Sequence, residues 1–327
     1  MDHGPIFIGG LERSGTSLIY ALLASHPNIA MTRRTNLWTY FYNQYGDLGR
    51  RDNFERCLNA MLHYKRLVVL KPDPERLRQE FWQGKPTYGR LFALLEQQYA
   101  DRVGKSRWGD KSLNTERYAD PIFAAYPSAK IVHMIRDPRD RYASALTRWK
   151  VSRGGIGAAT AMWLSSTKLA ERHRQRHPDH YLIVRYETLA REPEKTLREI
   201  CTFIDEDYTP TMLSLKGAEV FRDEGGNSSY GPRDPGVIST SSIGKFRKVL
   251  RPREIAFMQS HAKRKMLALD YPLESIQLSA GERLLFTLGD WPFNLARMLA
   301  WQTEEAIQNR LGRNLPAYRI VVETGRT

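Results

Sequence analysis

Short apolar segments alternate with longer segments of helical pattern along the chain. Ile6–Ile8, Ile131–Ile135 and Tyr181–Val184 are rich in β-branched or aromatic residues and are bounded by turn residues, which is typical of strands. Ser106–Gly109 carries a weaker signal of the same kind. Strands separated by helices are typical of crossover units, which build parallel sheets. The pattern therefore predicts an α/β fold with a central parallel sheet flanked by helices.

Helical patterns fill most of the remaining chain. The predicted helices are 16–25, 54–64, 88–100, 115–125, 139–150, 158–174, 193–204 and 251–267. Pro193 and Pro252 stand near the start of the last two, where helices often carry proline. Gly225–Ser242 is dominated by Gly, Asn, Ser, Pro and Asp, which predicts a long loop.

A helical tail follows the region of alternating strands and helices. Apolar residues recur there at near-helical spacing, namely Leu295, Met298, Leu299 and Ile307. We therefore predict a domain over residues 1–271 and a helical C-terminal extension over residues 272–327. We expect the extension to pack on the domain or on a second subunit, in a homodimer, in preference to a role in membrane-surface contact or acceptor binding.

The composition indicates a soluble globular protein. The chain has 327 residues, of which 41% are hydrophobic and 26% charged. No run approaches the roughly 20 apolar residues that span a bilayer, and no signal-peptide pattern precedes the first strand. Cys57 and Cys201 are far apart and lack metal spacing, so we expect reduced core thiols. We accordingly expect a cytoplasmic protein without a metal site.

The formal net charge of +14 favours an anionic partner. Nucleotides, nucleic acids, acidic glycans and membrane surfaces all fit this charge, and so does a plain solvated basic surface. No basic block interleaved with aromatic residues suggests an RNA or DNA module, so we expect no nucleic-acid partner.

The first predicted strand ends in a loop suited to phosphate. The stretch FIGGLERSGTS has almost the spacing of a nucleotide-binding P-loop between Gly10 and Ser17, but Thr16 stands where the lysine is expected. Arg13 supplies a positive charge in the middle of the loop instead. Backbone N–H groups before a helix and hydroxyl side chains bind anions well, whereas γ-phosphoryl transfer without the lysine is disfavoured. The alternative is a tight turn whose polar residues only cap the helix.

A second anion site is predicted after the strand Ile131–Ile135. Arg136 ends this strand, and Ser144 and Arg148 share one face of the following helix because they are four residues apart. A guanidinium group binds two phosphate oxygens at once. Two anion sites at two strand ends of one sheet imply a ligand that is phosphorylated at two places. An arginine–aspartate-capped strand end before a solvated helix is the simpler alternative.

These segments resemble the sulfotransferases that use 3′-phosphoadenosine 5′-phosphosulfate (PAPS). FIGGLERSGTS and IRDPRDRYAS are similar to the two nucleotide-binding segments of that family. WGDKS, VRYETLAREPEKTLREICTFI and SIGKFRKVL match further landmarks in the same order. The resemblance covers about Pro5 to Tyr271 and is closer to bacterial, Golgi-type and tyrosylprotein enzymes than to small-phenol enzymes. It implies a P-loop-like parallel sheet, PAPS as donor, PAP as product, and no required metal.

The resemblance also implies roles for individual residues. The 5′-phosphosulfate would be held by Arg13, Ser14, Gly15, Thr16 and Ser17. The 3′-phosphate would be held by Arg136 and Ser144 with support from Arg148, and the nucleotide would further contact Tyr186 and Lys245. Lys111 and Arg13 would stabilise the charge of the transferring group and the leaving phosphate. Lys111 has a simpler interpretation as a surface lysine beside Asp110, and Tyr186 as a core residue.

The catalytic base is where the sequence departs from the family. Arg34 occupies the position at which the family commonly has a glutamate, and an arginine cannot act as a base near neutral pH. The sequence leaves four candidates unranked, which are Asp52, His63, Asp110 and Glu116. Arg33 and Arg34 are predicted to bind an anionic acceptor or to form a basic solvated loop. Trp38 is predicted either to stack on the acceptor or to lie in the core.

The favoured interpretation is a sulfotransferase that acts on a hydroxyl of a carbohydrate, a glycolipid or another acceptor. Two alternatives remain open at this point. One is a kinase with a degenerate P-loop, against which the missing lysine speaks. The other is a non-catalytic nucleotide- or glycan-binding protein with the same fold, for which Arg34 is the best support.

Overall fold

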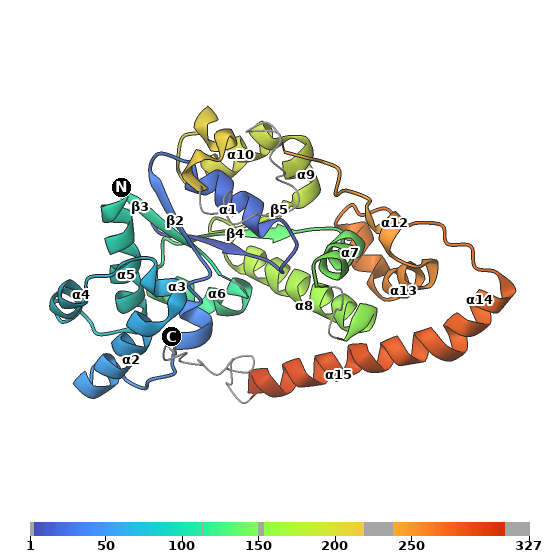
Figure 1. Cartoon of the computed structure of the whole chain (residues 1–327), viewed down its shortest axis with the longest axis horizontal. Helices are drawn as coiled ribbons and strands as arrows, with labels where there is room; N and C mark the ends of the chain where they lie inside the picture. Colours follow the sequence, from blue (N-terminus) through green and yellow to red (C-terminus); the bar gives the residue numbers. More distant parts are fainter. Residues whose placement is uncertain (1–2, 113, 150–153, 219–237, 311–327) are drawn as a thin grey trace, which may run out of the picture.

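The computed structural model describes residues 3–112, 114–149, 154–218 and 238–310. Within them, the chain builds a parallel sheet with the strand order β2-β3-β1-β4-β5, which Figure 1 shows at the centre of the molecule. The strands are β1 (Ile6–Gly9), β2 (Ile29–Arg33), β3 (Arg107–Lys111), β4 (Lys130–Ile135) and β5 (Tyr181–Arg185). All pairings are parallel, so the carboxyl ends of the strands share one edge of the sheet.

The two faces of the sheet are covered by different helices because side chains of a strand alternate between faces. Ile6 and Ile8 of β1 pack in a core cluster with α1 (Thr16–Ala24) and α10 (Pro193–Phe203). Phe7 points to the other face, into a cluster with the helices of residues 51–125. The helices of that second layer are α2 (Arg51–His63), α3 (Lys65–Val68), α4 (Pro74–Phe81), α5 (Tyr88–Arg102) and α6 (Ala119–Ala125).

Further helices surround the carboxyl edge of the sheet and complete the domain (Figure 1). These are α7 (Pro138–Trp149), α8 (Gly155–Arg176), α9 (Tyr186–Arg191), α12 (Phe246–Val249) and α13 (Pro252–Ala268). Single turns complete the connections at η1 (Leu37–Phe41), η2 (Thr115–Tyr118), η3 (Pro210–Ser214) and η4 (Lys216–Ala218). The α/β fold with a parallel sheet flanked by helices is thereby confirmed.

The strand β2 is the main element that the sequence did not predict. It forms the edge of the sheet and pairs with β3 alone, from Ile29 beside Arg107 to Arg33 beside Lys111. Its apolar run is only three residues long, and polar residues that include two arginines follow it. Neither the length of this run nor an alternation of apolar and polar residues indicates a strand. β3 also extends two residues beyond the predicted Ser106–Gly109, which places Lys111 inside the sheet.

Three smaller predictions have clear outcomes. The predicted helix 115–125 is a 3₁₀ turn, η2, followed by α6. Cys57 and Cys201 are free, buried thiols as expected. Residues 225–237 of the predicted loop Gly225–Ser242 lie outside the described part of the chain. The rest of that loop, residues 238–242, contains neither helix nor strand.

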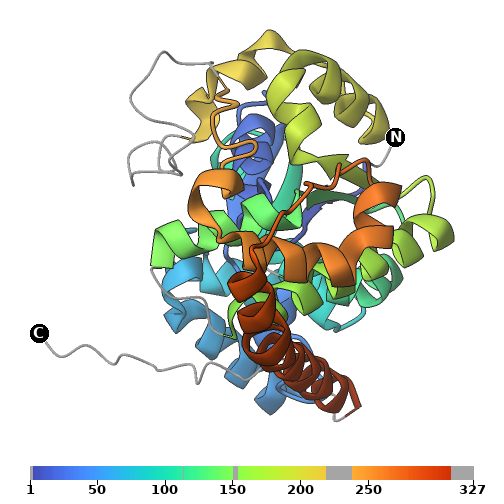
Figure 2. The same cartoon turned by 90° about the vertical axis from the view of Figure 1, so that its right-hand side faces the viewer.

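The C-terminal extension forms α14 (Ala280–Leu285), η5 (Phe286–Asp290) and α15 (Trp291–Arg310). Figure 1 shows α15 running along α8, and in Figure 2 the same helix runs obliquely from the middle of the view to the lower right. Glu305 of α15 forms an ion pair with Arg117 and accepts a hydrogen bond from Ser165 at 2.8 Å. These contacts attach the extension to the domain, whereas the boundary at residue 271 stays a prediction. No described helix has the length and apolarity needed to cross a bilayer.

The approach of α15 to α8 depends on Gly157, because a Cβ there would overlap the backbone carbonyl of Asn294. Gly157→Ala should push α15 away from α8 and destabilise the protein by about 1–3 kcal/mol, the usual cost of overpacking a close contact. Thermal unfolding and limited proteolysis of the extension measure this effect. Gly281→Ala is the matched control, since nothing lies within 4 Å of a Cβ at that exposed position. Equal behaviour of the two variants would contradict the close packing.

Candidate active site

The loop between β1 and α1 has the backbone of an anion-binding loop. Gly10, Arg13 and Gly15 adopt positive φ values of 112°, 69° and 93°. Position 15 requires glycine for two reasons. An L side chain would be strained at this φ, and its Cβ would lie 2.6 Å from the Tyr186 ring. α1 begins at Thr16, so the N–H groups of its first turn lie at the loop, where a helix favours a negative charge.

A buried carboxylate holds the backbone at the start of this loop through a hydrogen bond. Glu116 is 1% exposed, its Oε2 accepts the N–H of Gly10 at 3.2 Å, and its Oε1 accepts the hydroxyl of Ser166 at 2.9 Å. Glu116 was one candidate for the base. Both of its oxygens already accept hydrogen bonds inside the protein, so its placement favours a role in holding the loop.

The two predicted anion sites meet in the structure. The Arg13 Nε donates to Ser144 Oγ at 3.0 Å, and the Arg136 Nη1 donates to the backbone oxygen of Arg13 at 3.2 Å. Burial, together with the charges of Arg136 and Arg148, lowers the pKa of Arg13. Arg148 itself is exposed on α7. The loop residues Ser14 and Thr16 are buried and Ser17 is half-buried beside this cluster.

Tyr186 and Ser242 complete the surroundings of Arg136. The Arg136 guanidinium lies 4.4 Å from the centre of the Tyr186 ring, and its Nη2 donates to the Ser242 carbonyl at 2.7 Å. The hydroxyls of Tyr186 and Ser242 are 2.6 Å apart. The Arg136 Nε is buried and has no partner among the described residues, so one donor of this guanidinium is free for a ligand.

Asp140 holds the segment of Ser242 against α7. Its Oδ1 accepts the N–H of Phe246 at 2.9 Å and its Oδ2 the N–H of Gly244 at 2.6 Å. Burial raises the pKa of this carboxyl, while the two N–H groups counteract that shift. Lys245, predicted to contact the nucleotide, lies exposed in this segment at the start of α12.

Lys111 ends β3 beside Ile8 of β1, directly below the anion-binding loop. The backbone oxygen of Lys111 accepts the N–H of Arg34 at 2.8 Å, which fixes the segment after β2 next to it. The side chain is only 6% exposed. Burial and the charges of Arg34 and Arg33 lower the pKa of Lys111 to about 8. This buried ammonium group lacks a salt bridge among the described residues, unlike an ordinary surface lysine.

Asp110, another candidate for the base, points away from the site into a buried network. It is 2% exposed, and its Oδ1 lies 2.8 Å from Thr35 Oγ1 and 3.0 Å from Thr32 Oγ1. Burial raises its pKa. Glu96 Oε1 lies 3.0 Å from the same Thr32 hydroxyl, and burial beside Asp110 raises the pKa of Glu96 well above its ordinary value. This network holds the start of the segment that carries Arg34.

The other predicted residues lie in three different settings. Asp52 and His63 are exposed on α2, and the His63 Nδ1 lies 2.8 Å from the Asn59 carbonyl. Neither has a described contact with the loop or with Lys111. Trp38 is only 4% exposed and packs edge-on against Phe92, with ring centres 5.3 Å apart, so it is a core residue without a free face for an acceptor. Arg34 is exposed, and Arg33 is half-buried with its guanidinium 5.9 Å from the Tyr20 ring.

Several residues of the site were not predicted from the sequence. Glu12 directly precedes Arg13 in the loop, and its position inside the motif is the signal by which it could have been found. Asp140 lies inside the stretch IRDPRDRYAS, where only the arginine and serine positions were assigned. Glu187 accepts the N–H of Asp137 at 2.9 Å and the hydroxyl of Tyr271 at 3.2 Å, which holds the strand end that carries Arg136. Its partners are distant in sequence, so no local pattern marks it.

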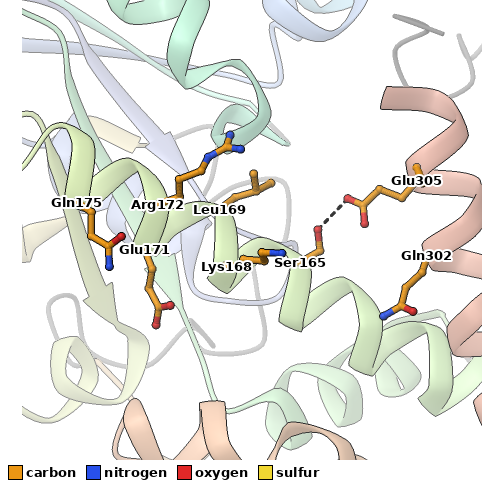
Figure 3. A pocket seen from close by; sticks show the side chains of 9 residues that line it. Ser165, Lys168, Leu169, Glu171, Arg172, Gln175, Gln302 and Glu305 are labelled. Carbon is orange, nitrogen blue, oxygen red and sulfur yellow. Dashed lines mark hydrogen bonds between the residues drawn. The ribbon is translucent and has the colours of Figure 1, made fainter. Parts of the chain in front are cut away.

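A cavity of about 490 Å³ lies apart from this cluster, between α8 and α15. Figure 3 shows its lining, with Lys168 and Arg172 on α8 and Glu305 on α15. None of the residues predicted to bind nucleotide or acceptor lines it. The described residues also contain no group of three or more His, Cys, Asp or Glu side chains arranged for a metal ion.

Comparison with known proteins identifies the family. The sequence profile of the sulfotransferase family matches residues 5–210. The chain belongs to the sulfotransferase family. A protein-tyrosine sulfotransferase of Drosophila melanogaster is 27% identical over 217 residues, a match that covers 64% of this chain and 39% of the fly protein. A putative protein-tyrosine sulfotransferase of Caenorhabditis briggsae is 26% identical over 234 residues, covering 66% of this chain and 71% of that protein.

Solved structures show the same fold. The sulfotransferase domain of the Synechococcus PCC 7002 olefin synthase superimposes with a TM-score of 0.57 at 22% identity, covering 84% of this chain and 98% of that one. The sulfotransferase domain from the curacin biosynthetic pathway gives 0.54 at 18% identity, covering 83% and 99%. The family resemblance predicted from the motifs is thereby confirmed.

Because the charged side chain of Lys111 is buried, we expect the free energy of unfolding of this sulfotransferase to depend on pH. The pKa of Lys111 is about 8 in the fold and 10.5 ordinarily, so the unfolded chain holds the proton more tightly. The charged side chain therefore opposes folding below about pH 8, and this cost fades as the pH rises towards 10.5. Lys111→Met should raise the free energy of unfolding at pH 7 by on the order of 3 kcal/mol or less, and by little at pH 10.

Denaturant unfolding at the two pH values measures this difference. Lys263→Met, at an exposed position on α13, is the control and should show no such pH dependence. A Lys111→Met variant that is less stable than the parent protein at pH 7 would show that the ammonium group is stabilised by its surroundings, contrary to our interpretation.

Proposed function

We propose that this sulfotransferase transfers a sulfuryl group from PAPS to a hydroxyl group of its acceptor. The convergence of Arg13, Ser144 and Arg136 at the ends of β1 and β4 carries this proposal, because it offers fixed hydrogen-bond donors and positive charge to a doubly phosphorylated nucleotide. Sulfuryl transfer builds up negative charge on the transferring and bridging oxygens, and such a cluster stabilises that charge.

The residues present fit the donor. The loop with its α1 N-terminus and Arg13 would hold the 5′-phosphosulfate, and Arg136 with its unpartnered Nε would hold the 3′-phosphate together with Ser144. Tyr186 and the segment that Asp140 fixes would enclose the nucleotide beside them. Lys111 would face the bridging oxygen, where an ammonium group stabilises the leaving phosphate. The loop lacks the lysine of a kinase P-loop, which speaks against γ-phosphoryl transfer.

The acceptor is proposed to carry negative charge near its reacting hydroxyl. Arg33, Arg34 and Lys111 lie together at the ends of β2 and β3, so an acceptor that approaches this edge meets three cations. An anionic carbohydrate or glycolipid satisfies this charge. A tyrosine flanked by acidic residues satisfies it equally well, and the curated relatives named above are protein-tyrosine sulfotransferases.

Two measurements test the proposal. Calorimetry should show tighter binding of PAP than of ATP, because only PAP carries the 3′-phosphate. Turnover of labelled PAPS against a set of sulfated sugars, glycolipids and acidic tyrosine peptides identifies the acceptor. A protein that binds PAP but transfers no label to any of them would be the non-catalytic binding protein, and a preference for ATP would restore the kinase alternative.

Arg136→Ala should weaken PAP binding by about 1.5–3 kcal/mol, the usual contribution of hydrogen bonds to a charged group. Calorimetry on folded variants, checked by circular dichroism, measures the loss. Arg198→Ala removes an equal charge from the exposed surface of α10 and should leave the affinity unaltered. If both variants bind PAP equally, Arg136 does not hold the 3′-phosphate.

A further inference from the structure

Transfer to a hydroxyl group needs a group that takes up the hydroxyl proton, and the three carboxylates in or beside the anion-binding loop and Lys111 are of two kinds. Asp110 and Glu116 are 2% and 1% exposed and accept hydrogen bonds inside the protein. Glu12 is half-buried and forms neither a hydrogen bond nor a salt bridge within the described part of the chain. Of these three carboxylates, Glu12 alone is accessible to a substrate.

Chain geometry places Glu12 at the reacting end of the proposed donor site. It follows β1 by three residues and directly precedes Arg13, and the end of β1 lies beside the end of β3 that carries Lys111. Leu11 packs on the apolar cluster around Trp163 of α8, so the loop is fixed on both sides of Glu12. Glu12 therefore lies in a part of the anion-binding loop whose neighbouring residues, Leu11 and Arg13, attach it to α8 and α7.

A buried arginine of α7 interacts electrostatically with this carboxylate. Arg141 is 3% exposed, its Nε has no partner among the described residues, and its Nη2 contacts only the sulfur of Met162 at 3.8 Å. Burial lowers the pKa of Arg141, and the charge of Glu12 raises it. Glu12 likewise raises the pKa values of Lys111 and Arg13. Lys111, Arg13 and Arg141 thus interact electrostatically with the Glu12 carboxylate, and no salt bridge joins Glu12 to them among the described residues.

We propose that Glu12 is the general base that takes the proton of the acceptor hydroxyl. This inference rests on the proposed function. The acceptor oxygen forms a bond to sulfur, the bond from sulfur to the bridging phosphate oxygen breaks, and that oxygen leaves on PAP with the electron pair. The hydroxyl proton moves to a Glu12 oxygen and is later released to water, so charge and atoms balance. Arg141 acts as a positioning residue.

The test uses the reverse reaction, for which the acceptor need not be known. PAP receives a sulfuryl group from phenyl sulfate or from 4-nitrophenyl sulfate, and the protonated base returns a proton to the departing phenol. The 4-nitrophenolate ion leaves readily without that proton, whereas phenolate, whose conjugate acid has a pKa of about 10 like tyrosine, does not. Loss of an acid–base group typically costs about 10²–10⁴-fold in rate.

Glu12→Gln should therefore lower transfer from phenyl sulfate by about 10²–10⁴-fold. The loss with 4-nitrophenyl sulfate should be at least tenfold smaller, and PAP should bind at least as tightly because a negative charge is gone. Glu12→Asp should restore part of the rate with phenyl sulfate. Glu194→Gln, on the exposed surface of α10, is the matched control and should behave like the parent protein.

Equal losses with the two sulfate esters, or no loss with either, would overturn the assignment of Glu12. Failure of the proposed function has a different signature, because the parent protein itself would then bind no PAP and transfer no sulfuryl group from either ester.

Discussion

Concentration of positive charge at the carboxyl edge of a parallel sheet is the constraint on which the rest of this structure depends. β1, β3 and β4 end side by side, and they or the segments after them bring Arg13, Lys111 and Arg136 together. Like charges this close oppose folding, and after burial the charge of Arg136 is the largest cause of the lowered pKa of Arg13. The arrangement becomes favourable when a polyanion binds, since the same charges then meet phosphate and sulfate oxygens.

The cations are held in place by buried carboxylates that act on the backbone around them. Glu116 binds the N–H of Gly10, Glu187 that of Asp137, and Asp140 those of Gly244 and Phe246. A carboxylate whose oxygens accept hydrogen bonds from backbone N–H groups fixes a loop without forming a salt bridge to the arginines of the site. The guanidinium groups therefore keep donors for the ligand, and the unpartnered Nε of Arg136 is the clearest example.

The sequence predicted the parts of the site that local pattern determines. Arg13, Arg136 and Ser144 lie in motifs whose spacing follows from a strand, a turn and a helix, and the structure brings these residues into contact. β2 was not predicted, because its pairing with β3 defines it more than its own short apolar run does. The roles of Glu116 and Asp110 depend on partners more than 70 residues away, which no local pattern reveals.

The placement of Arg34 and Glu12 shows why a shifted carboxylate is chemically consistent with this site. Arg34 adds a positive charge to the acceptor side, at the end of β2, and its backbone is bonded to that of Lys111. In the loop, the charge of Glu12 raises the pKa values of both Lys111 and Arg141. The side proposed to bind the acceptor substrate can then be wholly cationic, because the proposed general base, Glu12, lies in the loop directly before Arg13.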